Sequence, residues 1–99
     1  MSEAATLRLD GDLDLAVRDA VAATLDECVE RAIEAKVSLV VDTGDVTFID
    51  SSGLSLIARA CLRLETAGER LVISNTPTIV RRALELTGLG HLCDDAVAG

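Results

Sequence analysis

The tetrapeptide Asp50-Ser51-Ser52-Gly53 places two hydroxyl groups beside a carboxylate, directly after an apolar and largely β-branched run at residues 46–49. From Leu54 onward the apolar positions recur at helical spacing, which predicts that this tetrapeptide lies at a helix start. The first N–H groups of a helix have no intrahelical partner, and the aligned peptide dipoles leave partial positive charge there. A phosphoryl group on either serine could therefore be accommodated without a change of fold.

Two other interpretations of these serines need to be weighed. In the structural one, Asp50 or Ser51 is simply the N-cap of the helix, which is typically worth about 1 kcal/mol. In the catalytic one, a serine is a nucleophile, but the chain has a single histidine, His91, and lacks a Gly-x-Ser-x-Gly elbow. We therefore expect no catalytic residue and no enzyme activity.

Aspartates and cysteines are the other residues that could do chemistry. Six aspartates in turn-rich segments are of the type that holds Mg²⁺ or accepts a phosphoryl group, but the preference of Asp for caps and turns explains most of their positions. One histidine and three cysteines without a Cys-x-x-Cys pair make a zinc site improbable. We expect no metal and no cofactor. Cys28 and Cys61 fall in apolar stripes, while a redox switch between Cys61 and a partly exposed Cys93 stays open as an alternative. The six aspartates are Asp10, Asp12, Asp14, Asp42, Asp45 and Asp50.

Composition narrows the classes of partner. The 99 residues carry a formal net charge of −8 and only one aromatic ring, Phe48, so neither phosphate attraction nor base stacking favours nucleic acid. We expect an aliphatic core in one domain, residues 1–99. The sequence has no signal-peptide pattern and no apolar run of membrane-spanning length, which predicts a cytoplasmic protein without direct membrane insertion.

Periodicity and turn residues divide the chain into strands that alternate with helices. Asp14 is the expected N-cap of the first long helix, Thr76 and Pro77 are expected to start the last one, and Gly68 and Gly88 are expected to end helices. We expect strands at residues 6–10, 37–41, 70–74 and 91–93, and a strand-like run at 46–49 that leads into the two serines. Helices are expected at about 15–35, 52–67 and 77–87, turns at 11–12 and 42–45, and a tail at 94–99.

This order predicts an α/β fold whose central sheet is mixed but mostly parallel, with about four strands and three to four flanking helices. The continuous apolar run at residues 37–41 is typical of a central strand covered on both faces. The carboxyl ends of parallel strands meet at one edge of a sheet. Residues 11–14, 42–45 and 50–52 are therefore expected to lie together.

Four blocks in this order resemble the STAS domain of bacterial anti-sigma factor antagonists. They are Leu9-Asp10-Gly11-Asp12-Leu13-Asp14, Val40-Val41-Asp42, the block from Val46 through Asp50-Ser51-Ser52-Gly53-Leu54, and Leu86-Thr87-Gly88-Leu89. The resemblance spans nearly the whole chain and implies the same β/α fold. The first strand of the family has no counterpart before residue 6. We therefore expect the strand carrying Leu7 and Leu9 to have a free pairing edge, through which the chain could form a homodimer.

The resemblance also implies a function. In that family the serine before the glycine, here Ser52, is phosphorylated by an anti-sigma factor that is also a GHKL-type serine kinase. The unphosphorylated protein binds this kinase and releases the sigma factor, and a serine phosphatase reverses the modification. An added dianion near Asp12, Asp14 and Asp50 would repel an acidic partner rim. The partner-binding residues that the resemblance implies are Gly11, Asp12, Asp14, Asp50, Ser51, Ser52, Gly53 and Leu54.

A second function belongs to another class. STAS domains also occur as accessory subunits of membrane transport systems, including lipid transporters and anion carriers, where they are assembly or regulatory parts. The intact Asp50-Ser51-Ser52-Gly53 block favours the anti-sigma antagonist. Capture of a GHKL-type kinase would indicate the first function, whereas capture of an ABC-transporter ATPase or a permease would indicate the second.

Overall fold

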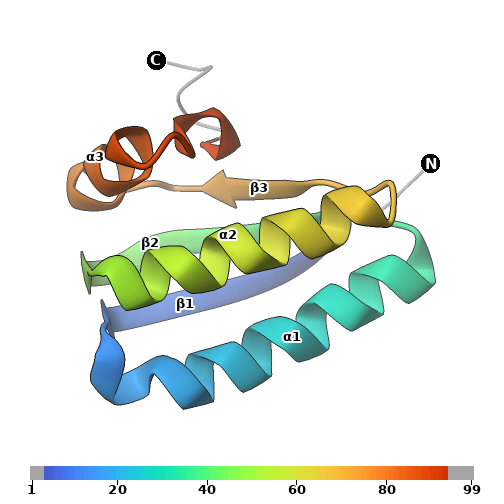
Figure 1. Ribbon diagram of the computed structural model, residues 1–99, viewed down its shortest axis with the longest axis horizontal. Helices are drawn as coiled ribbons and strands as arrows, with labels where there is room; N and C mark the ends of the chain where they lie inside the picture. The colour runs from blue at the N-terminus through green and yellow to red at the C-terminus, as the bar shows by residue number, and fades with distance from the viewer. Residues whose placement is uncertain (1–3, 94–99) are drawn as a thin grey trace.

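The structure, a computed structural model, describes residues 4–93 and confirms the α/β fold class (Figure 1). Three strands alternate with three α-helices and two short 3₁₀-helices within this range. The tail expected at 94–99 lies outside the described residues. In chain order the elements are β1 (Ala5–Leu13), η1 (Leu15–Val17), α1 (Arg18–Ala35), β2 (Leu39–Ile49), α2 (Ser51–Thr66), β3 (Leu71–Ser74), α3 (Thr78–Leu86) and η2 (Gly90–Leu92).

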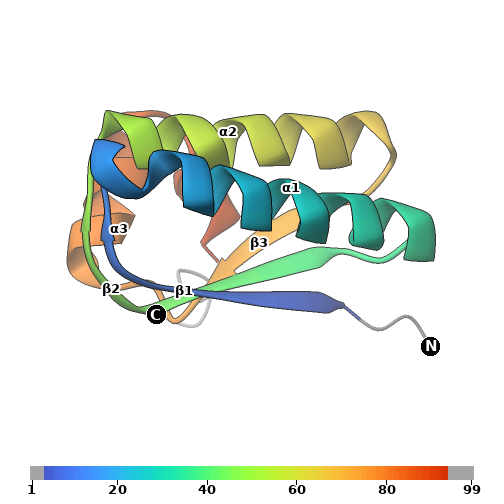
Figure 2. The same cartoon turned by 90° about the horizontal axis from the view of Figure 1, so that it is seen from below.

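The strands form a parallel sheet in the order β1-β2-β3, and α1 and α2 lie side by side over one face of it (Figure 2). Burial alternates along β2, where Leu39 and Val41 are fully buried and Val40 between them is only half-buried. The expectation that this strand is central is confirmed. The expectation that it is covered on both faces is wrong, because the large helices pack on one side. None of the helices within residues 4–93 has the length and apolarity needed to cross a membrane.

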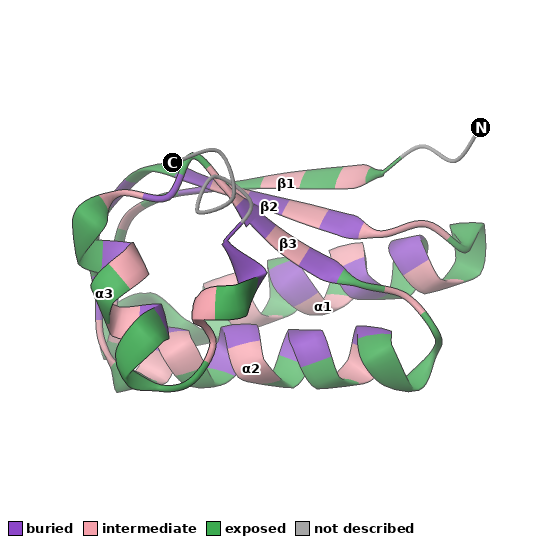
Figure 3. Ribbon diagram, turned by 90° about the horizontal axis from the view of Figure 1, so that it is seen from above, coloured by how far each residue is buried: buried purple, intermediate pink, exposed green. Residues whose placement is uncertain are grey.

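The core between the sheet and the helices is aliphatic, as expected (Figure 3). Each large aliphatic side chain buried in this core contributes roughly 1.5–3 kcal/mol to the free energy of unfolding. Phe48 is 43% exposed, and Leu62, which helical spacing places on the apolar stripe of α2, is 65% exposed. The fully buried side chains include Leu39, Ile57, Leu64, Ile73 and Leu84.

The turns expected at residues 11–12 and 42–45 are absent from the described chain because both segments continue as strand. Between Arg8↔Asp42 and Asp10↔Asp45, and again between Gly11↔Val46 and Asp12↔Phe48, β2 advances one residue more than β1. These register shifts absorb the turn-forming residues as bulges, which bend a strand without ending it.

Several element boundaries also differ from expectation. The first long helix starts as the 3₁₀-helix η1, and α1 proper begins at Arg18. Pro77, rather than Thr76, is the extended N-cap residue of α3. In place of a strand at residues 91–93, η2 is followed by a single bridge between Cys93 and Ile73.

The C-terminal ends of the helices share one hydrogen-bonding pattern. Gly68 and Gly88 end α2 and α3 with positive φ, as their sequence positions predict. The end of α1 has the same geometry, with φ 58° at Lys36, whose N–H donates to the Ile33 carbonyl at 3.1 Å. A left-handed backbone costs a residue with a Cβ about 1–2 kcal/mol, so Lys36 is strained where glycine is not.

Lys36→Gly is therefore expected to raise the free energy of unfolding by about 0.5–1 kcal/mol, less than the full strain because glycine loses more entropy on folding. Urea denaturation of the variant and wild type measures this difference. The matched change Gly68→Lys, at the equivalent end of α2, is expected to lower stability. An unchanged midpoint for both variants would contradict the assignment of strain.

The three cysteines differ in accessibility. Cys61 and Cys93 are 6% and 3% exposed, so the expectation of a partly exposed Cys93 is wrong, whereas Cys28 is half-buried on α1. Burial raises the pKa of the Cys61 thiol, and the nearby Glu65 carboxylate raises it further. Because the thiolate is the reactive form, Cys61 is a poor nucleophile at neutral pH.

Iodoacetamide is therefore expected to modify Cys28 first in the folded protein, with Cys61 and Cys93 protected. Mass spectrometry of the native and the urea-unfolded chain measures the three rates. In urea the rates should become similar. Fast modification of Cys61 or Cys93 in the folded state would contradict the packing described above.

Candidate functional site

Strands β1 and β2 end side by side, and each is followed by an aspartate that caps a helix. Leu13 pairs with Ile49 in the register of the sheet. The next residue of β1, Asp14, accepts a hydrogen bond from the Ala16 N–H at 3.0 Å. The corresponding residue after β2, Asp50, accepts from the N–H groups of Ser52 and Gly53. Two helix N-termini therefore meet at one edge of the sheet.

The two serines occupy the first turn of α2. Ser51 and Ser52 are its first and second residues, the former exposed and the latter half-buried. The Asp50 Oδ1 to Ser52 N distance is 2.8 Å, and the Leu54 N–H donates to the Asp50 carbonyl at 3.0 Å. Asp50 is thus the N-cap, which leaves the side chains of both serines without a capping role. The Ser52 side chain is partly accessible to another protein.

Gly53 brings α2 into close contact with the end of β1. A Cβ at this position would lie 2.8 Å from the Leu13 carbonyl oxygen and 2.9 Å from Ile49 Cγ1. The same Leu13 oxygen accepts a hydrogen bond from the Asp50 N–H at 3.2 Å. Only glycine allows the helix start and the strand end to approach this closely.

The rim of the site is acidic and partly apolar. Asp12 accepts a hydrogen bond from the Thr47 hydroxyl at 2.6 Å, and Gly11 before it has φ 70°. Asp14 is the second carboxylate of the rim, and Leu15 directly after it is 71% exposed. All the residues expected at the site lie at this end of β1 and β2: Gly11, Asp12, Asp14, Asp50, Ser51, Ser52, Gly53 and Leu54.

Residues 42–45 do not join them, so that part of the expected convergence is wrong. Asp42 pairs in register with Arg8, and Asp45 forms an ion pair with the same arginine. The Asp42 side chain accepts a hydrogen bond from the Gly44 N–H at 2.9 Å. Because β2 continues to Ile49, these carboxylates lie in mid-strand rather than at its carboxyl end.

Sequence patterns missed an apolar groove next to the serines. Its volume is about 240 Å³, and it lies between the first turns of α2 and the chain that follows α3. Two of its lining residues, Thr87 and Leu89, belong to the block Leu86-Thr87-Gly88-Leu89, which was noted above only for its family resemblance. The groove is lined by Ser51, Leu54, Ser55, Ala58, Thr87 and Leu89.

A family model described as "Mlab, STAS domain" matches residues 1–94. The chain belongs to the STAS domain family. The match covers the sheet, all three α-helices and the serine-bearing turn, which confirms the family suggested by the sequence blocks.

Solved structures of STAS proteins have the same fold. The anti-sigma factor antagonist SpoIIAA in its unphosphorylated form has a TM-score of 0.76 at 23% identity, covering 100% of this chain and 91% of that one. The phosphorylated form of SpoIIAA, a Bacillus cell fate determinant, has a TM-score of 0.71 at 22% identity, covering 99% and 91%. A sulfate transporter family protein from Wolinella succinogenes has a TM-score of 0.68 at 21% identity, covering 97% and 71%.

Proposed function

We propose that this STAS domain is an anti-sigma factor antagonist that is switched by phosphorylation of Ser52. Its unphosphorylated form binds an anti-sigma factor with GHKL-type serine kinase activity and thereby releases the sigma factor. Phosphorylation ends the binding, and a serine phosphatase restores it. The observation that carries the proposal is a half-buried serine in the first turn of α2, at an edge of the sheet that other proteins can reach.

The helix start supports a change of charge without a change of fold. A phosphoryl group adds about −1.5 to −2 charges, and the positive end of the α2 dipole offsets part of their cost. Asp50 already holds the N–H groups of Ser52 and Gly53 through its side chain. The first turn is thus ordered before modification, so the new charge acts mainly on what binds there.

Binding rather than catalysis is the chemistry that the surroundings of Ser52 favour. The one histidine of the sequence, His91, lines a different cavity with Glu65 and Arg70. Glu65 and Ser52 lie near opposite ends of α2, separated by about 20 Å at 1.5 Å per residue. An imidazole at that distance cannot remove a proton from the serine, so we propose that the domain is not an enzyme.

Phosphate mapping tests the proposal. The chain is incubated with ATP and candidate GHKL-type anti-sigma kinases, and the phosphate is located by mass spectrometry. Modification of Ser52 in the wild type, its loss in Ser52→Ala and its retention in Ser51→Ala are the expected results. Phosphate on Ser51 alone, or no phosphate with a kinase that binds the chain, would contradict the assigned switch.

A transport function is the second candidate. One observation favours it: a solved structure with the same fold is that of a sulfate transporter family protein. In this role the same edge of the sheet would contact a transporter subunit. A pull-down separates the candidates, since a GHKL-type kinase supports the antagonist and an ABC-transporter ATPase or a permease supports the accessory subunit.

A further inference from the structure

The outer side of β1 is an unpaired edge of the sheet within residues 4–93. β1 pairs with β2 on its inner side only, whereas β3 at the opposite edge has a bridge to Cys93. β1 is nine residues long and contains no proline. β1 therefore lacks two of the devices that protect sheet edges, a short length and a proline, while Arg8 and Asp10 place exposed charges on it. This edge is therefore able to pair with another strand.

The direction of the backbone groups in β1 determines which residues would pair. The Ala5 N–H donates to the Ser38 carbonyl, on the β2 side, at 2.9 Å. Backbone groups alternate in direction along a strand, so Thr6, Arg8 and Asp10 direct their N–H and C=O groups outward. These outward-facing groups are the ones available to a second strand.

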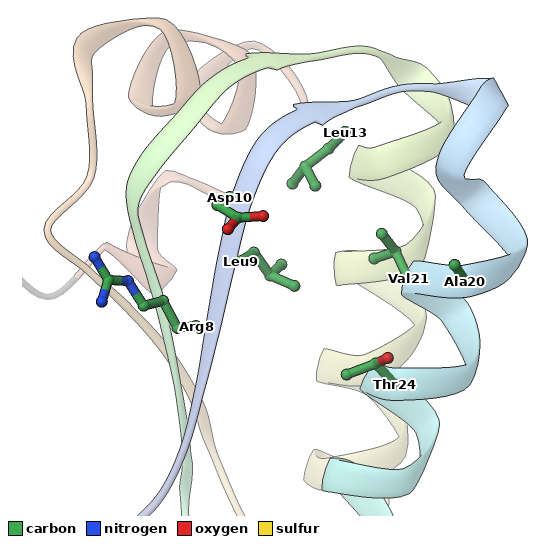
Figure 4. Close-up of a pocket in the computed structure, with 7 residues that line it drawn as sticks. All are labelled: Arg8, Leu9, Asp10, Leu13, Ala20, Val21 and Thr24. Carbon is green, nitrogen blue, oxygen red and sulfur yellow. The ribbon is translucent and has the colours of Figure 1, made fainter.

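The charges on this edge favour one register. Arg8 lies on the side of β1 away from α1, while Leu9 faces α1 (Figure 4). In an antiparallel pair of two β1 strands centred on Leu9, Arg8 of each copy lies opposite Asp10 of the other in a hydrogen-bonded position. Centring the pair on Arg8 instead would place two arginines opposite each other. Opposite charges therefore favour the first register and disfavour the second.

The face of β1 toward α1 offers little apolar surface to a second copy. An open cavity of about 200 Å³ lies beside Leu9 between β1 and α1 (Figure 4). Leu13, Ala20 and Val21 contribute apolar lining to it. Because Leu9 is only 7% exposed, it packs in the core of its own copy, and the charged side chains rather than this leucine determine the register.

We propose that two copies of this chain associate through β1, antiparallel and centred on Leu9. The two sheets become continuous, and the helices of both copies lie on the same side. The contact is stabilised by the outward backbone groups and by the two Arg8–Asp10 pairs between copies. It does not depend on the switch proposed for Ser52.

Sedimentation equilibrium over micromolar to millimolar concentrations tests the dimer with charge-swapped variants. Wild type is expected to dimerise, and Arg8→Asp to dimerise at least about tenfold more weakly, because like charges then face each other twice. The double variant Arg8→Asp with Asp10→Arg is expected to recover dimerisation, because the opposite charges are restored in reversed order.

Asp45→Asn is the matched control, because it removes the Arg8–Asp45 ion pair within one copy and leaves Arg8 in place. Because Arg8 is then free to pair with Asp10 of the second copy, dimerisation is expected to be at least as strong as that of wild type. Circular dichroism melting confirms that each variant is folded. A wild type that stays monomeric throughout, a dimer insensitive to Arg8→Asp, or a double variant that fails to recover while folded would each overturn the proposal.

Discussion

Ser52→Asp is expected to bind the anti-sigma kinase at least about tenfold more weakly than the wild-type chain, a loss of about 1.4 kcal/mol or more. The new carboxylate would join Asp12, Asp14 and Asp50 and would face the acidic rim that we expect on the partner. Like charges that face each other across an interface cost up to several kcal/mol of binding free energy. Isothermal titration calorimetry measures the affinities. Raising the ionic strength should reduce the loss, because salt screens partly exposed charges.

Ser52→Asn is the matched control, because asparagine has nearly the shape of aspartate without its charge. It is expected to bind almost as well as wild type. The free energy of unfolding should differ between the two variants by less than about 1 kcal/mol, the usual size of a charge effect at a helix N-terminus. Equal affinities of Ser52→Asp and Ser52→Asn would exclude charge as the switch.

Gly53→Ala is expected to lower the free energy of unfolding by about 1–3 kcal/mol, the usual cost of an extra methyl group in a closely packed contact. Helix propensity alone predicts the opposite, since alanine is favoured over glycine by about 1 kcal/mol in a helix interior. The contact decides the sign, because the added Cβ would lie 2.8 Å from a backbone oxygen, that of Leu13. Urea denaturation measures the change.

Gly90→Ala is a suitable comparison for this second prediction. The nearest atom to a Cβ at residue 90 is Glu85 Cγ at 3.0 Å, which belongs to a flexible side chain and can move. Its cost should therefore be clearly smaller than that of Gly53→Ala. A Gly53→Ala protein as stable as wild type would show that α2 can shift away from β1 without loss. In that case the Gly53→Ala protein should also be phosphorylated at Ser52 as readily as wild type.

The helices and the serine-bearing turn could be predicted from the sequence because their signals are local. Apolar spacing marked the α2 stripe, Gly68 and Gly88 marked two helix ends, and Asp50 was one of two residues expected to cap α2. Each of these signals involves residues about four positions apart or fewer. A helix bond joins residues of the same separation, so sequence spacing and structure coincide.

The path of β2 could not be predicted in this way. Asp42 and Gly44 belong to residue types that favour turns, yet the chain passes through them as strand. Asp42 and the nearby Asp45 pair with Arg8 and Asp10, which lie more than thirty positions earlier in the sequence. Register shifts against β1 fixed these residues in mid-strand, and local preference gave no information about that pairing.

The sequence by itself determined the family blocks, the aliphatic core, the alternation of strands with helices and the position of Ser52 at a helix start. Only the tertiary structure decided that the large helices cover one face of the sheet, that Phe48 and Leu62 are exposed, and that Gly53 lies against Leu13. The physical reason is the range of the interactions. Capping and helix periodicity act within one or two turns of chain, whereas burial and strand register depend on segments that meet only after folding.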